Sequence, residues 1–118
     1  MAEKISQTLL EYAAPLLAQL PPETPLQQRQ ALLQIVMSVW NAMVVAQWTQ
    51  RDVLPDLYRQ LETMPPPGHA QMRAWVDALV ERKRQYFADD LRAVGHWELR
   101  MKPSGEVSLW AEARSPPR

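Results

Sequence analysis

The sequence contains no cysteine, only two histidines and only three glycines. Without cysteine the chain has no disulfide framework, no thiolate metal site and no cysteine nucleophile. Two histidines are too few for a histidine-rich metal cage. The sequence also lacks a glycine-rich phosphate loop and a Gly-x-Ser-x-Gly motif, which would indicate nucleotide binding or serine hydrolysis. We therefore expect no cofactor and no enzymatic activity.

The chain also lacks an excess of charge, because 13 Lys and Arg residues offset 13 Asp and Glu residues. A net charge of zero argues against a generally cationic protein that binds nucleic acid or membrane surfaces. With 118 residues, 47% of them hydrophobic, the chain can build one ordinary core. We predict a single domain over residues 1–114 and a disordered tail over residues 115–118.

One uncharged stretch, Gln30–Gln50, is the only part of the sequence that resembles a membrane span. Polar residues interrupt it at Gln34, Ser38, Asn41 and Gln47, so we interpret it as the buried central helix of a soluble protein. The N-terminus has spaced apolar positions and no continuous hydrophobic run of the signal-peptide type. We therefore expect a cytoplasmic protein with no membrane partner.

Prolines, 11 in all, divide the first half of the chain into predicted helices. Residues 3–19 have one apolar helical face, and Pro15 within it predicts a kinked helix or two short pieces. Thr24 is a suitable N-cap, Pro25 suits a first helical position, and Gln27 completes a capping box. We predict a central helix over residues 25–48, apolar around most of its circumference.

A third, shorter helix is predicted to begin near residues 52–54, because Pro55 is tolerated only in a first turn. Residues 65–68, Pro-Pro-Pro-Gly, end it with a stiff connector. A fourth helix over residues 69–88 has apolar positions at helical spacing: Met72, Trp75, Val76, Leu79, Val80, Tyr86 and Phe87. Its other face is charged.

Near residue 93 the apolar period changes from 3.6 to 2, which predicts a C-terminal antiparallel hairpin over about residues 93–114. A loop at Pro103–Gly105 sets the register. Opposed positions are Met101 and Val107, Leu99 and Leu109, Trp97 and Ala111, Arg100 and Ser108, and His96 and Glu112. The predicted fold class is therefore α+β and mainly helical, with four helices and this hairpin.

The chain has five tryptophans and one phenylalanine. Trp40, Trp75 and Trp97 fall on apolar faces and are predicted core residues, with Trp48 at the core margin. Trp110 instead falls on the polar face of the hairpin, opposite Glu98, unless a bulge moves it inward. Tryptophan is favoured at protein interfaces, so we expect Trp110, with Glu98, Arg100 and His96, to bind a partner.

Two alternative sites deserve comparison with this one. Arg82, Lys83, Arg84 and Arg100 could contact the phosphates of a nucleic acid, although mixed charges are typical of a solvated helix face. Asp89, Asp90, His96 and Glu98 are the densest group of metal-type ligands and could serve a metal-dependent hydrolase. Aspartates at a helix end more often serve as turn and capping residues.

These patterns favour a small, non-enzymatic protein-interaction module of a bacterial cytoplasm. It would act as a regulatory, adaptor or immunity-type protein and bind a protein partner or a second copy of itself. The contact surface would be the hairpin and the adjacent helix surface, since a two-stranded hairpin leaves both strand edges unpaired unless something covers them.

Overall fold

The computed structural model describes residues 4–63, 68–104 and 107–114 of the chain. The elements follow in the order α1 (Ile5–Leu17), α2 (Leu26–Thr49), α3 (Leu54–Leu61), α4 (Gly68–Tyr86), β1 (Ala93–Met101) and β2 (Val107–Arg114). The described residues therefore confirm the α+β, mainly helical fold. Residues 65–67 of the predicted connector, residue 105 of the predicted hairpin loop and the predicted tail at residues 115–118 lie outside them.

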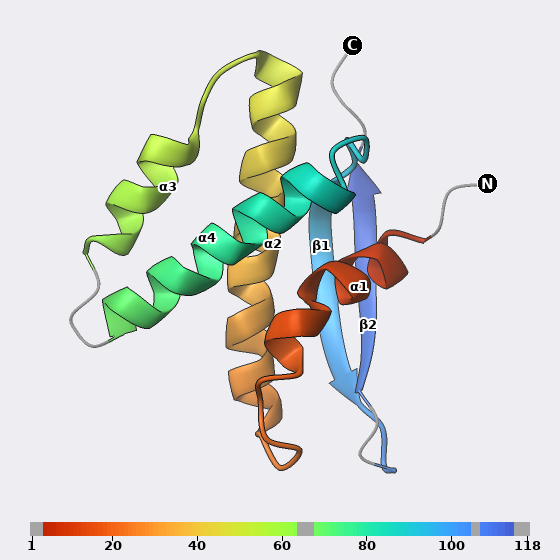
Figure 1. The fold of residues 1–118 in the computed structure, drawn as a ribbon. Coiled ribbons are helices and arrows are strands. Elements are labelled where there is room, and N and C mark those ends of the chain that lie inside the picture. The colour runs from red at the N-terminus through yellow and green to blue at the C-terminus, as the bar shows by residue number, and fades with distance from the viewer. Residues whose placement is uncertain (1–3, 64–67, 105–106, 115–118) are drawn as a thin grey trace.

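The helices and the hairpin form two layers. Figure 1 shows α2 and the hairpin side by side in one layer, with β1 between α2 and β2. α1 and α4 form the second layer and cross over the first. The molecule measures 43 × 41 × 23 Å, and the short dimension is that of two stacked layers. α3 packs against α2 and α4 at the side away from the hairpin.

The core centres on α2, which packs against α1, α3, α4 and β1. Tyr12, Trp40 and Phe87 stack edge to face, with ring centroids 5.1 to 5.9 Å apart, the favoured geometry for aromatic pairs. The Tyr12 hydroxyl donates to the carbonyl oxygen of Leu79 at 2.6 Å. Among the described helices, α2 alone is long and apolar enough to cross a membrane, by length and composition only.

α1 runs unbroken from Ile5 to Leu17 with Pro15 inside it, so the alternative of two short pieces is wrong. Pro15 has no amide hydrogen to offer the carbonyl of Glu11. The guanidinium of Arg82 on α4 supplies the missing donor, with Nη2 2.8 Å from the Glu11 oxygen and Nε 3.0 Å from the Tyr12 oxygen. A tertiary contact thus replaces the helical hydrogen bond.

The capping box predicted at the start of α2 is wrong. α2 begins at Leu26 with Pro25 as its N-cap residue, and no side chain caps it. The Thr24 hydroxyl donates instead to the carbonyl oxygen of Pro21 at 2.6 Å, and the Thr24 carbonyl accepts from Arg29 Nε at 3.1 Å. The buried Thr24 hydroxyl therefore stabilises the turn before α2 and makes no hydrogen bond to the first amides of the helix.

The hairpin has the predicted register over most of its length. Met101 pairs with Val107, Leu99 with Leu109, Trp97 with Ala111, and Arg100 with Ser108. Between Val94 and Trp97 the register shifts, because β1 uses one residue more than β2 there, as in a β-bulge. The predicted opposition of His96 and Glu112 therefore does not form a regular pair.

Side chains of α2 bind the chain that leads into the hairpin. Trp40 Nε1 donates to the Arg92 carbonyl at 2.7 Å, and Trp48 Nε1 donates to the Leu91 carbonyl at 2.8 Å. Asn41 makes two bonds to Val94, since its Nδ2 donates to the Val94 oxygen at 3.0 Å and its Oδ1 accepts from the Val94 amide at 2.7 Å. This pairing holds β1 against α2.

Candidate interaction surface on the hairpin

Five side chains form what we call the outer face, the side of the hairpin turned away from the core. β1 contributes His96, Glu98 and Arg100, and β2 contributes Ser108 and Trp110. Side chains alternate between the two sides of a strand, and the apolar partners Trp97, Leu99 and Leu109 are the ones that pack on the core. The outer face lines a shallow, open hollow of about 520 Å³.

Glu98 lies at the centre of the charges on the outer face. Its Oε2 accepts from Arg100 Nη2 at 2.6 Å and from Arg100 Nε at 3.2 Å, and its Oε1 lies 3.2 Å from His96 Nε2. The hydrogen bond from Arg100, followed by that from His96, lowers the pKa of Glu98. The three side chains lie in a row along β1 and contact one another.

Trp110 stands beside this row and pairs with Glu98 across the hairpin. Its side chain is 53% exposed, so the bulge in β1 does not carry it inward. The indole ring lies 5.6 Å from the His96 ring, tilted by 56°. The arrangement offers a rigid aromatic surface next to an ion pair, which suits contact with a protein surface.

The other tryptophans lie where their spacing predicted. Trp40 is fully buried, and Trp48, Trp75 and Trp97 are half-buried and pack against the core. Tyr86 differs from its predicted place on the apolar side of α4, because it is 69% exposed. It lies at the last turn of α4, and its ring is covered in part by Arg82, whose Cζ lies 5.4 Å from the ring centroid.

The candidate metal ligands are not gathered into one site. His96 and Glu98 lie on the outer face, whereas the Asp90 carboxylate binds Arg92, with Oδ2 2.6 Å from Nη2 and Oδ1 2.9 Å from Nε. Burial alone would raise the pKa of Asp90, but the hydrogen bonds and charge of Arg92 outweigh it and lower that pKa. Within the described ranges, no group of three Asp, Glu or His side chains could hold a metal ion.

The candidate phosphate-binding residues point to different surroundings. Lys83 is 2% exposed; its Nζ donates to the carbonyls of Phe87 and Asp90 and lies 4.4 Å from the Trp40 ring centroid. Burial lowers the pKa of Lys83, against the opposing charges of Asp90 and Asp89. Lys83 thus acts as a cap for the end of α4, a place that favours positive charge.

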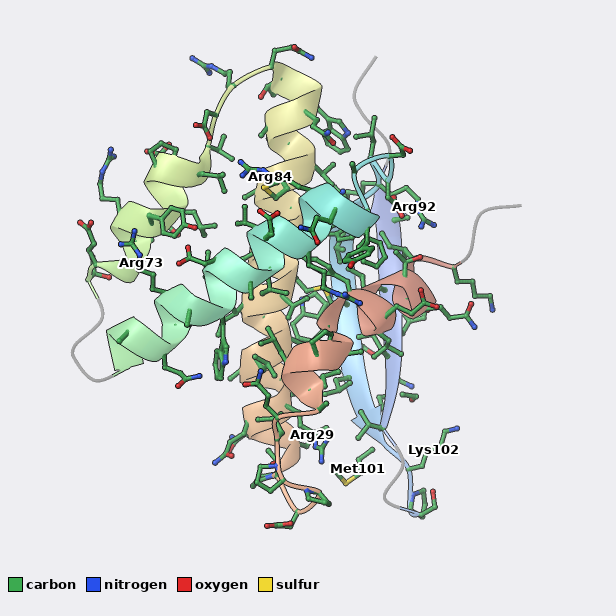
Figure 2. All side chains as sticks on the ribbon, viewed as in Figure 1. Arg29, Arg73, Arg84, Arg92, Met101 and Lys102 are labelled. Atoms are coloured by element: carbon green, nitrogen blue, oxygen red, sulfur yellow. The ribbon has the colours of Figure 1, made fainter. Side chains whose placement is uncertain are left out.

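Of the other three, Arg82 is bound to the backbone of α1 and Arg100 to Glu98, while Arg84 is exposed on α4. Figure 2 shows the labelled side chains Arg29, Arg73, Arg84, Arg92 and Lys102 at widely separated places on the molecule. These five basic side chains therefore do not lie in one continuous stripe of the kind that follows a nucleic-acid backbone.

Sequence reasoning did not identify Ser108 as part of the outer face site, or Asn41 as the residue that fixes β1. The alternation that located Trp110 also places Ser108 on the same side, so that signal was present. Asn41 carried no comparable signal, because its partner Val94 is 53 residues away. Comparisons with protein-family models, with curated proteins and with solved structures find no match.

Proposed function

We propose that this chain is a small, non-enzymatic protein-interaction module that binds a protein through the outer face of its hairpin. The observation that carries the proposal is Trp110, an indole half-exposed in the middle of a strand. Large exposed aromatics on rigid elements are the residues that anchor protein interfaces. The opposite side of the hairpin packs on α1 and α2, so Trp110 is held in place before a partner arrives.

The surroundings of Trp110 support the same function. His96, Glu98 and Arg100 provide charges of both signs beside the ring. Polar groups at the margin of an aromatic contact give an interface its specificity and orientation. A partner for this surface would present an apolar patch to Trp110 and hydrogen-bonding groups to the Glu98–Arg100 pair.

The test compares two variants that each remove one exposed aromatic ring. The wild-type chain, Trp110→Ala and Tyr86→Ala are used to capture proteins from the cells that produce the chain, and the captured proteins are quantified. We expect a set of proteins that the wild type and Tyr86→Ala retain equally and that Trp110→Ala retains at least about tenfold less, the effect of losing an interface anchor worth 1.4 kcal/mol or more.

Circular dichroism melting checks that both variants fold. Equal retention of every captured protein by Trp110→Ala and the wild type would exclude the outer face as the binding surface. Retained nucleic acid that is lost in Arg84→Ala but kept in Trp110→Ala would support the alternative function, nucleic-acid binding by the basic side of α4.

A further inference from the structure

The two edges of the hairpin are treated differently by the fold. The edge of β1 faces α2, where the Asn41 amide takes both the N–H and the C=O of Val94. The bulge between Val94 and Trp97 lies on the same strand. Covering an edge and bulging it are two of the means by which proteins prevent a strand from pairing with another chain.

β2 has no comparable protection. Figure 1 shows it as the outer strand of the sheet, with β1 between it and α2 and with α1 crossing in front of it. In the described part of the chain no hydrogen bond reaches its outer backbone edge. Its eight residues, VSLWAEAR, include no proline and no lysine, the residues that commonly block an edge. A regular strand of this length can accept another strand.

The hydrogen bonds of Asn41 also show which residues of β2 direct their backbone N–H and C=O groups to the free edge of the strand. In an antiparallel pair, the N–H and C=O of one residue point to the same side. Val94 directs both groups to Asn41 and away from β2, so its partner Ala113 directs its own groups away from β1. By alternation, Val107, Leu109 and Ala111 also direct their N–H and C=O to the free edge.

We propose that a second copy of this chain pairs its own β2 with this edge, antiparallel, with Trp110 opposite Trp110 of the second copy. The result is a four-stranded sheet in a two-fold dimer. The inference rests on the proposed function, because it names the protein that the Trp110 surface contacts. A two-fold axis at Trp110 uses residues 107–113 of both strands, nearly the whole length of β2.

The side chains of β2 are self-complementary in this register. On the side of the sheet that carries the outer face, the Ser108 hydroxyl lies opposite the carboxylate of Glu112 of the second copy, a donor facing an acceptor. On the inner face, large residues meet small ones, since Leu109 lies opposite Ala111 and Val107 lies opposite Ala113. The two indoles occupy a non-hydrogen-bonded pair, in which opposed side chains approach most closely.

Neighbouring registers lack this fit. With the axis at Glu112, two carboxylates face each other, which is unfavourable. With the axis at Ala111, Trp110 faces a carboxylate and the aromatic pair is lost, although Ser108 then faces Arg114. Of these three registers, the axis at Trp110 is the one that pairs the two indoles and opposes no like charges.

Engineered disulfides test both the dimer and its register, because the chain has no cysteine of its own. In the variant Ser108→Cys/Glu112→Cys, each new thiol lies opposite a thiol of the second copy, with Cβ atoms about 5 Å apart. Within one chain the two positions are four residues apart on a strand, about 13 Å, and cannot bridge. We expect mild oxidation to yield a covalent dimer, resolved on a non-reducing gel.

The matched control is Ser108→Cys/Arg114→Cys, which would bridge only with the axis at Ala111. A covalent dimer from this control and none from the first variant would overturn the proposed register. The unmodified chain is sedimented in parallel, so that the test does not depend on the variants folding. A monomer at every concentration, together with no disulfide in either variant, would overturn the homodimer, whereas the capture experiment with Trp110→Ala decides the proposed function separately.

Discussion

Arg82 has a structural role that its sequence neighbourhood conceals. It stands in the run Glu-Arg-Lys-Arg, which is typical of a solvated helix face, yet its guanidinium reaches the carbonyls of Glu11 and Tyr12. The ring of Phe87 lies 5.6 Å from its Cζ. A cation that binds the backbone next to Pro15 makes a proline inside α1 tolerable.

We predict that the cost of losing Arg82 depends on Pro15. Arg82→Met keeps most of the aliphatic stem but removes both hydrogen bonds, and should lower the free energy of unfolding by about 1–3 kcal/mol. In a Pro15→Ala background the same change should cost less, because the amide of residue 15 can then donate to the Glu11 carbonyl. Urea unfolding of the four proteins of this double-mutant cycle measures the coupling.

Arg73→Met is the matched control for this cycle. Arg73 lies over the ring of Tyr58, 5.1 Å from its centroid, at the other end of α4, so its removal should be independent of Pro15. An equal cost of Arg82→Met in both backgrounds would show that Arg82 does not compensate for the proline.

At the scale of elements, α2 positions the hairpin chiefly through polar groups at its own surface. Trp40, Asn41 and Trp48 all bond to backbone atoms of residues 91–94. Residues 91–94 lead from the loop after α4 into β1. The backbone N–H and C=O groups of such a segment need hydrogen-bond partners when they are buried, and side chains of α2 supply them. The position of β1, and with it the direction of Trp110, follows from these bonds.

We predict that Asn41→Leu destabilises the fold without a large change in apolar packing. The variant leaves the amide and the carbonyl of Val94 without their partners, and each orphaned buried group costs about 1–3 kcal/mol. Urea unfolding should show the loss, and the Val94 amide should exchange with solvent faster. Gln34→Ala, an exposed polar change on the same helix, should stay within about 0.5 kcal/mol of the wild type.

Full stability of Asn41→Leu, with unchanged protection of the Val94 amide, would contradict this role. That result would require the contacts of Trp40 and Trp48 alone to fix the start of β1.

The elements that were predictable from the sequence are those set by local patterns. Proline positions and apolar spacing located the four helices, and the alternation from Trp97 to Ala111 gave the hairpin register. The failures depend on contacts between distant residues. Thr24 was expected to cap α2 but bonds to Pro21, and the bulge near Gly95 accompanies bonds from Asn41 on another element.

The candidate site shows the same division. Trp110 and Glu98 were predictable as opposed, outward residues because alternation within a hairpin is a local rule. Lys83 was not predictable as a buried cation, because its burial depends on α2 and its carbonyl acceptors lie beyond the end of α4. A run of basic letters cannot distinguish a solvated guanidinium from an ammonium group that caps a helix.

For the whole molecule, the asymmetry of the sheet matters most. α2 closes one edge and leaves β2 as the outer strand of the sheet, in a molecule only 23 Å thick. Pairing β2 with a second copy would satisfy the remaining strand edge and would double the width of the outer face. An isolated two-stranded hairpin gains stability from additional strands, so folding and assembly of this chain should be linked.

This linkage predicts that the midpoint of thermal unfolding rises with protein concentration. For unfolding coupled to dissociation of a dimer, each tenfold increase in concentration contributes about 1.4 kcal/mol, which corresponds to a shift of several degrees for a domain of this size. Calorimetry of the wild type over about a hundredfold range of concentration measures it.

The variant Ala111→Pro should remove that dependence. Ala111 directs its amide to the free edge, so proline there deletes a hydrogen bond to the second copy and none within the hairpin, the setting in which edge strands tolerate proline. Ala111→Val adds bulk at the same place but keeps the amide, and should melt with the concentration dependence of the wild type. Two results would show that the free edge of β2 takes no part in self-association. One is a wild-type unfolding midpoint that does not change with protein concentration, and the other is an Ala111→Pro midpoint that rises with concentration as much as that of the wild type.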